Sequence, residues 1–115
     1  MPPRLIRAQK ASSVKVAPEV VSFLDRSKDE WLHQKVQDAF DALKEDLLSG
    51  GKVPKSRIPR YYRQKWEVQN LYVLDLGPDW RLIYTVEFDG VGSGVVVLDV
   101  LTHKGYDRRF GYRTT

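Results

Sequence analysis

Apolar side chains recur at helical spacing in the first half of the chain. Between residues 30 and 48 they are separated by four, four, three and four positions, at Leu32, Val36, Phe40, Leu43 and Leu47. Residues at this spacing share one face of an α-helix. The pattern predicts a long helix that begins after Asp29, whose carboxylate can accept hydrogen bonds from first-turn amides. Trp31 and Leu48 are expected to widen the apolar face, and Gly50-Gly51 to end the helix.

A shorter amphipathic segment precedes this helix. Its apolar residues within 19–26 are Val20, Val21, Phe23 and Leu24. Pro18 suits the first helical turn, where its missing N–H group has no partner to lose. Upstream, Val14, Lys15 and Val16 alternate and predict a short edge strand.

The pattern changes to period two after Leu71. Three β-rich runs follow, LYVLDL, WRLIYTVEF and VVVLDVLT, separated by the turn signals GPD and DGVGSG. Short connections predict an antiparallel meander, with the helical pair covering one face of its sheet. The intervening segment 49–66 is basic and punctuated by prolines, and is expected to be mostly loop with room for one helical turn.

These elements fit one domain. The chain has 115 residues, and neither an internal repeat nor a domain boundary is visible. We expect a flexible basic arm over residues 1–12 and a single α+β domain over residues 13–115, built from an edge strand, a two-helix hairpin and the meander. With 42% hydrophobic and 30% charged residues, the chain should fold with a well-solvated surface.

The composition also narrows the setting. The chain has no cysteine, which excludes disulfides and thiolate metal sites. No apolar run approaches the roughly 18 residues that a membrane span needs, and the N-terminus has no secretory apolar segment. A cytoplasmic protein without membrane association is expected.

The net charge of +4 hides a segregated pattern. Residues 1–18 contain four basic residues and no acid, whereas residues 19–48 contain eight acids and four bases. Residues 49–66 contain six bases and no acid, and the tail after residue 102 is again basic. Basic patches of one sign attract polyanions such as nucleic acid, and guanidinium groups bind phosphate in a bidentate way. The alternative is an ordinary solvated surface.

Four stretches together resemble a known toxin superfamily. They are SVKVAPEVVSFL, DALKEDLLSG, NLYVLDLGPDWRLIYTV and VVVLDVLTHKGYDRRFGY, which cover most of residues 13–112. The order of elements and the string Trp80–Tyr84 resemble the RelE/ParE superfamily of toxins from type II toxin–antitoxin systems. The resemblance implies a compact RelE-like toxin that a cognate antitoxin protein neutralises.

RelE-like and ParE-like members differ in activity. For a RelE-like member the resemblance implies a ribosome-dependent, metal-independent endoribonuclease that cleaves mRNA in the decoding site. For a ParE-like member it implies a non-catalytic inhibitor of DNA gyrase. A third reading is an RNA-binding module without nuclease activity, because one fold hosts several functions. The sequence has no phosphate-cradling glycine motif after a strand, and its two histidines are isolated, so no nucleotide or metal cofactor is expected.

Arg81 is the first candidate catalytic residue. It occupies the strand on which the resemblance implies an arginine that stabilises the transition-state phosphate. Strand alternation groups Arg81 with Ile83 and Thr85, away from the face that the helices are expected to cover. The alternative is a structural arginine paired with a sheet carboxylate at Asp75, Asp79 or Glu87.

Three residues after the last strand complete the candidate catalytic set. His103 can exchange a proton near neutral pH, Lys104 can neutralise phosphate, and Tyr106 can stack on a base or donate a proton. A phenol is a poor base near neutrality unless its pKa is depressed. The alternatives are a surface histidine, a solvated lysine and a tyrosine packed on the sheet.

Candidate RNA-binding residues fall in two segments. The first contributes Arg57, Arg60, Tyr61, Arg63 and Lys65, and the tail contributes Arg108 and Arg109. Cations interleaved with aromatic rings bind phosphates and stack unpaired bases. Alternatively the aromatic rings cover the core while the basic groups stay in water, which is the expectation for Trp66.

The run LYVLDL departs from the RelE pattern. RelE-type nucleases have lysines on the strand before the arginine strand, and this run has none. If the protein cleaves RNA, the acid and base are then His103, Tyr106 or a lysine of the basic segment.

Overall fold

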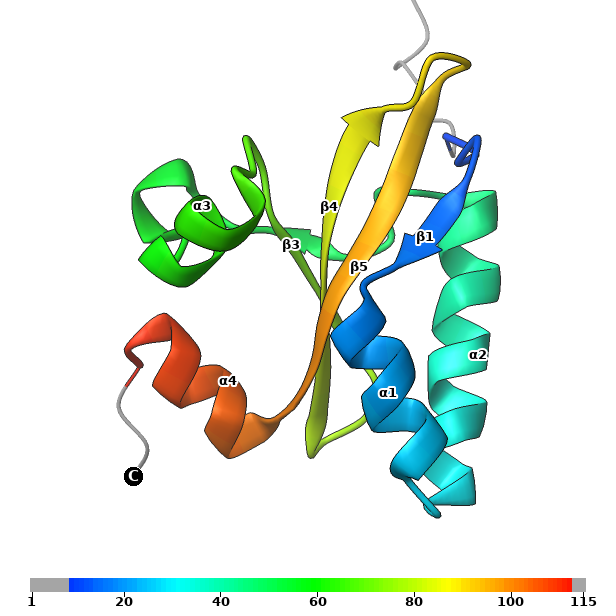
Figure 1. Cartoon of the computed structure of the whole chain (residues 1–115), viewed down its shortest axis with the longest axis vertical. Coiled ribbons are helices and arrows are strands. Elements are labelled where there is room, and N and C mark those ends of the chain that lie inside the picture. Colours follow the sequence, from blue (N-terminus) through cyan, green and yellow to red (C-terminus); the bar gives the residue numbers. More distant parts are fainter. Residues whose placement is uncertain (1–8, 113–115) are drawn as a thin grey trace, which may run out of the picture.

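A five-stranded sheet runs through the middle of the computed structural model, with helices on both of its faces (Figure 1). The structure describes residues 9–112. The strands are β1 (Val14–Val16), β2 (Gly51–Lys52), β3 (Tyr72–Asp75), β4 (Trp80–Phe88) and β5 (Ser93–Thr102). The helices are α1 (Pro18–Arg26), α2 (Glu30–Glu45), the short 3-10 helix η1 (Lys55–Arg57), α3 (Arg60–Trp66) and α4 (His103–Phe110).

The expected meander is present. β3, β4 and β5 pair antiparallel in sequence order, as their short connections predict. The edge strand β1 is also confirmed, and it pairs in parallel with β5. At the other edge β2 pairs antiparallel with β3, so the strand order is β1-β5-β4-β3-β2. Because β1 and β5 are parallel, the sheet is mixed rather than purely antiparallel.

Most of the proposed basic arm, residues 1–8, lies outside the described residues. The part that is described is tied to the domain by its backbone. Ala11 N–H donates to the Lys44 carbonyl at 3.0 Å, Ser12 N–H donates to the Ser93 carbonyl at 2.9 Å, and Leu47 N–H donates to the Gln9 carbonyl at 2.9 Å.

The long helix begins as predicted but ends earlier. The Asp29 carboxylate accepts a hydrogen bond from Leu32 N–H at 3.1 Å, which caps α2. α2 stops at Glu45, because the Asp46 carboxylate accepts from Leu48 N–H at 3.0 Å and turns the chain. The expectation that Gly50-Gly51 ends the helix is therefore wrong.

The apolar face of α2 is narrower than expected. Trp31 and Leu48 are 45% and 44% exposed and do not widen the buried face. Ala39 is buried instead, between Val36 and Leu43 on the same helical face. The small side chain fits because α2 lies close against the sheet.

Helices cover both faces of the sheet, not one. α1 and α2 lie against one face, where their buried side chains meet Leu82, Tyr84 and other sheet residues (Figure 1). α3 and α4 lie on the other side. There a second buried cluster contains Val53, Ile58, Tyr62, Leu71, Ile83 and Leu98. Alternation of side chains along β4 supplies both clusters.

A β-bulge in β5 decides which face one carboxylate occupies. Ile83 pairs with Asp99 and Tyr84 pairs with Val97, so Leu98 is an extra residue on β5. Strict alternation would put Asp99 on the same face as Val97, among the apolar contacts of α1 and α2. After the bulge, Asp99 instead faces α3 and α4.

Segments 49–66 and 103–112 contain more regular structure than expected. Segment 49–66 forms β2, η1 and α3 rather than mostly loop. The basic tail forms α4, which begins where the Thr102 hydroxyl accepts from Gly105 N–H at 3.0 Å. α4 ends at Gly111, whose φ of 73° favours glycine. Across residues 9–112, no helix combines the length and apolar content of a bilayer span.

The hydroxyl of Tyr84 gives the first testable prediction. It is fully buried, donates to the Leu47 carbonyl at 2.8 Å and accepts from Gly50 N–H at 2.9 Å. Tyr84→Phe leaves both backbone groups without this partner and should lower the free energy of unfolding by about 1–3 kcal/mol, measured by urea denaturation. Tyr72→Phe is the matched control: its ring stacks on Tyr84, and its hydroxyl has no hydrogen-bond partner among residues 9–112. Equal effects of the two substitutions would contradict the prediction.

Candidate functional site

The start of β4 and the start of α4 lie side by side. Trp80 pairs with Thr102 across the β4–β5 ladder, and His103 N–H donates to the Asp79 carbonyl at 2.8 Å. Because β4 begins where β5 ends, Arg81 comes next to the first turn of α4. The structure thus brings Arg81 next to His103 and Tyr106, which lie more than twenty positions further along the sequence.

Arg81 is held by a carboxylate and by its own turn. Its Nε lies 3.0 Å from Asp75 Oδ1, and its Nη1 donates to the carbonyls of Gly77 and Trp80 at 3.2 and 3.0 Å. Its side chain is only 16% exposed. The pairing with Asp75 is the one that we weighed as the structural alternative for Arg81. The sequence placed Arg81 on the face of the sheet opposite the expected helices. That face is not open to solvent, because α4 covers it.

His103 connects Arg81 to a second carboxylate. Arg81 Nη2 lies 3.2 Å from His103 Nδ1, and His103 Nε2 lies 3.3 Å from Asp107 Oδ2. Since Arg81 only donates, Nδ1 accepts and Nε2 carries the hydrogen that faces Asp107. Both ring nitrogens are therefore engaged. This arrangement suits an orienting role for His103 better than proton transfer.

Tyr106 lies beside the guanidinium and keeps its proton. The Arg81 guanidinium carbon is 5.9 Å from the centre of the Tyr106 ring. Burial, together with the neighbouring Tyr112 hydroxyl, raises the pKa of Tyr106 to about 12. A phenol with this pKa is protonated at physiological pH, so Tyr106 can act as a proton donor but not as a base.

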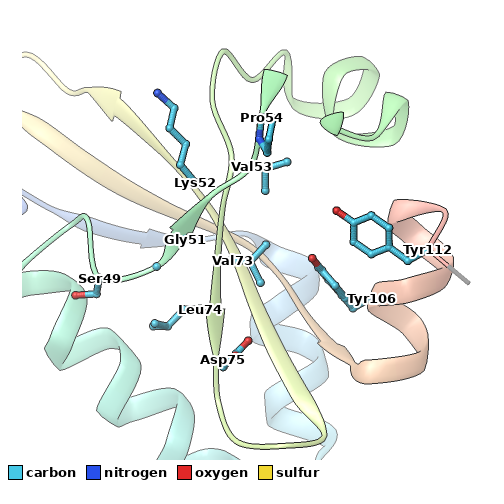
Figure 2. A pocket seen from close by; sticks show the side chains of 11 residues that line it. Ser49, Gly51, Lys52, Val53, Pro54, Val73, Leu74, Asp75, Tyr106 and Tyr112 are labelled. Carbon is cyan, nitrogen blue, oxygen red and sulfur yellow. The ribbon is translucent and has the colours of Figure 1, made fainter. Parts of the chain in front are cut away.

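A hollow of about 480 Å³ opens next to this group (Figure 2). Tyr106 of α4 and Tyr112, which follows α4, lie on one side of it, and Lys52, Val53 and Pro54 lie on the other. Asp75 also lines the hollow, which joins it to the Arg81 contacts. Its volume is in the range of ligand sites.

Sequence reasoning did not single out three residues of this hollow. Lys52 comes from β2 and belongs to the basic segment, where a lysine was expected to help if RNA is cleaved. Asp75 was expected only as a possible structural partner of Arg81, and Tyr112 was not among the expected site residues. The basic character of segment 49–66 pointed to Lys52, but nothing in the sequence places this residue opposite Tyr106.

Arg109 and Asp99 form a second cluster that fastens α3 and α4 to the sheet. Asp99 Oδ2 accepts from the Tyr62 hydroxyl at 2.8 Å and from Arg109 Nη1 at 2.9 Å. The Arg109 guanidinium carbon lies 3.8 Å from the centre of the Tyr61 ring. Lys65 extends the cluster by donating to the Tyr61 hydroxyl at 3.1 Å. Arg109 and Tyr61 thus contribute to the packing of α3 against α4 as well as to the basic surface.

The remaining candidate cations are exposed. Lys104 and Arg108 lie on α4, Arg57 lies in η1, and Arg60 and Arg63 lie on α3. The Arg63 guanidinium donates to the Lys55 carbonyl. Lys65 also pairs with Glu19 of α1 at 3.3 Å.

The folded chain separates charge between the two sides of its sheet. Segments 49–68 and 103–112, which supply α3 and α4, contain nine basic and two acidic residues. Residues 19–48, which supply most of α1 and all of α2, contain eight acids and four bases. Figure 1 shows α3 and α4 on one side of the sheet and α1 and α2 on the other. The charge pattern of the sequence therefore gives the protein a basic side and an acidic side, and the Arg81 cluster and the hollow lie on the basic side.

Comparison with models of protein families, with curated proteins and with solved structures returns no match to this chain. The geometry and the charge of the site therefore carry the functional argument.

The Asp99 cluster gives a stability prediction. Asp99→Asn removes the negative charge that both Tyr62 and Arg109 share, and hydrogen bonds to charged groups contribute about 1.5–3 kcal/mol. We expect a comparable fall in the free energy of unfolding, measured by urea denaturation. Asp41→Asn is the matched control, since the Asp41 carboxylate is exposed on α2 and bonds only to Gln37 among the described residues. A loss no larger than that of the control would contradict the clamping role of Asp99.

Buried tyrosines predict loss of stability at high pH. Burial raises the pKa of Tyr84 to about 12, and burial next to Asp99 raises that of Tyr62 further. In the unfolded chain these groups ionise near pH 10. Between pH 10 and 12 the folded chain therefore binds more protons than the unfolded chain, and the free energy of unfolding falls as pH rises.

The measurement is urea denaturation at a series of alkaline pH values. Each such tyrosine contributes up to about 1.4 kcal/mol per pH unit in this window. Tyr84→Phe removes one contribution, so its profile should be shallower than that of the wild type, and lysine ionisation cancels in the comparison. Parallel profiles would contradict the assignment.

Proposed function

We propose that this protein is a RelE-like toxin that cleaves mRNA next to Arg81. The observation that carries the proposal is a hollow lined by Asp75 and Tyr106, both of which lie next to the Arg81 guanidinium. The Asp75 carboxylate lies 3.0 Å from the Arg81 guanidinium, and the protonated phenol of Tyr106 lies on the same side. A base, a cation and an acid are what metal-independent RNA cleavage needs.

Each group has one role in the proposed reaction. The ribose 2′-oxygen attacks the neighbouring phosphorus while Asp75 takes the 2′-hydroxyl proton. Arg81 offsets the charge that grows on the phosphate oxygens. Tyr106 gives its proton to the 5′-oxygen as the bond from phosphorus to that oxygen breaks. The products are a 2′,3′-cyclic phosphate and a 5′-hydroxyl, and water returns the proton from Asp75 to Tyr106.

His103 and the exposed cations serve this site indirectly. We assign His103 to orienting Arg81, because both of its ring nitrogens are engaged. Lys52, Lys104 and the cations of α3 and α4 would contact the RNA backbone and, on a ribosome, ribosomal RNA.

The order of elements also supports a RelE/ParE-like fold. An edge strand, two helices, a three-stranded meander and a C-terminal segment bearing the histidine follow the order that the sequence resemblance implies. In the same proposal the protein partner is a cognate antitoxin, encoded beside this chain, that neutralises the toxin by covering the basic side.

A second candidate is a binding protein without catalysis. The observation that favours it is the saturation of Arg81, whose contacts with Asp75, His103 and the Gly77 and Trp80 carbonyls leave only one Nη2 hydrogen without a described partner. A phosphate would have to share or displace these contacts. Such a protein would act as a ParE-like gyrase inhibitor or as an RNA-binding module.

Primer extension on mRNA from translating ribosomes tests the first candidate. The wild type should produce site-specific cuts. Arg81→Ala should reduce cutting by about a hundredfold or more, because the phosphate loses its cation. Asp75→Asn should reduce it by roughly 10²–10⁴-fold, the contribution typical of an acid or base. Arg26→Ala, at the exposed end of α1 on the acidic side, is the matched control and should cut like the wild type.

The other outcomes separate the remaining candidates. Intact mRNA together with blocked DNA supercoiling would support gyrase inhibition. Intact mRNA together with RNA binding that weakens steeply with salt would support the RNA-binding module. Either result would overturn the nuclease proposal.

A further inference from the structure

A second hollow lies on the other side of His103. It has a volume of about 270 Å³ and is lined by Asp79, Trp80, Thr102, His103 and Lys104. Trp80 is only partly buried, and part of its indole packs against Phe23 with ring centres 5.9 Å apart. The wall of this hollow is therefore an indole and an imidazole accompanied by an exposed ammonium group.

Arg81 lines neither hollow but contacts residues that line each of them. Asp75 and Tyr106 line the first hollow, and His103 lines the second. The Arg81 guanidinium touches Asp75 through Nε at 3.0 Å and His103 through Nη2 at 3.2 Å. The guanidinium thus contacts a lining residue of each hollow, so a strand whose phosphate lies at Arg81 has both hollows as neighbours.

We propose that the second hollow binds a nucleobase of the same RNA strand, next to the phosphate at Arg81. This inference rests on the proposed RNA-cleaving function and extends it. The base stacks against the Trp80 indole, and Lys104 pairs with the phosphate of that nucleotide. The Asp79 carboxylate is exposed at the same hollow and can accept a hydrogen bond from a base amino group.

The chemistry of the wall favours single-stranded nucleic acid. Aromatic rings stack on any base, whereas cations beside the rings hold the backbone, and the two together are the usual basis of single-strand binding. A purely apolar peptide side chain would use the indole but would leave the Lys104 ammonium group at this hollow without a partner. Trp80 is accordingly a binding residue of the RNA and not part of the catalytic group.

Binding of an RNA that cannot be cut tests this site. The probe is a short single-stranded oligoadenylate with 2′-O-methyl riboses, labelled for fluorescence anisotropy, and the intact chain is used. Trp80→Leu should weaken binding by at least roughly fivefold, because one stacked base is lost. Trp80→Phe keeps a ring and should retain most of the affinity.

Two controls separate binding from folding. Trp31→Leu removes a tryptophan that is 45% exposed on α2, on the acidic side, and should bind like the wild type. Circular dichroism shows whether Trp80→Leu is folded. If it is not, the RNA affinities of Trp80→Phe and Trp80→His, which keep a ring, are compared with that of Trp80→Met, which does not.

The outcomes distinguish this site from the reaction. Binding that depends on the ring at position 80, in a protein that leaves mRNA intact, would retain the site and overturn the nuclease. If the protein cleaves mRNA but neither Trp80→Leu nor Trp80→Met weakens RNA binding, the proposed nucleobase site is overturned and the nuclease proposal is retained. Indifference to these variants would also be the result if the second hollow accepts a protein segment instead.

Discussion

The double burial of β4 is the constraint on which the rest of the structure depends. Leu82 and Tyr84 point to one face and Ile83 to the other, and each of the three is fully buried. A central strand that is apolar on both faces needs a cover on both sides. α1 and α2 supply one cover, and α3 and α4 supply the other. The second cover brings α4, with His103 and Tyr106, over the beginning of β4.

The same contacts serve stability and the proposed chemistry. Asp75, Arg81, His103 and Asp107 form a continuous line of polar contacts from the outer part of the sheet to α4. Buried charges are stabilised when they have a partner, and in this line the largely buried Arg81 and Asp107 side chains each have one. It also fixes the guanidinium beside a carboxylate that faces a hollow. In the proposed reaction these groups are therefore preorganised, because their contacts hold them in place before a substrate arrives.

Division of charge gives the two covers different surfaces. α1 and α2 present a mostly acidic exterior, and the elements around α3 and α4 present a basic one with tyrosines among the cations. Asp99 on β5 holds this basic cover against the sheet, because its carboxylate accepts hydrogen bonds from Tyr62 of α3 and Arg109 of α4. Without a carboxylate at that point, Arg109 would stack on Tyr61 with its charge only partly compensated. In the proposed function, two hollows that each include a contact residue of Arg81 would receive neighbouring nucleotides of one strand.

Local sequence rules were sufficient for β1, α1, most of α2 and the β3–β4–β5 meander, but not for β2, η1, α3 and α4. The spacing of Leu32, Val36 and Leu43 predicted α2, Asp29 predicted its first turn, and the three β-rich runs predicted the meander, because each signal depends on residues that are close in the sequence. The segregated charge was also visible in the sequence, and the string Trp80–Tyr84 drew attention to Arg81.

Only the tertiary structure decided which groups meet. The bulge at Leu98 turned Asp99 to the basic side, against the alternation that the run VVVLDV suggests, because a bulge depends on the pairing of β4 with β5. The partnership of Arg81 with Asp75 and His103, the position of Lys52 opposite Tyr106 and the helical form of the tail likewise depend on contacts between distant segments. Periodicity records how a segment repeats along its own axis. It contains no information on where another segment will lie.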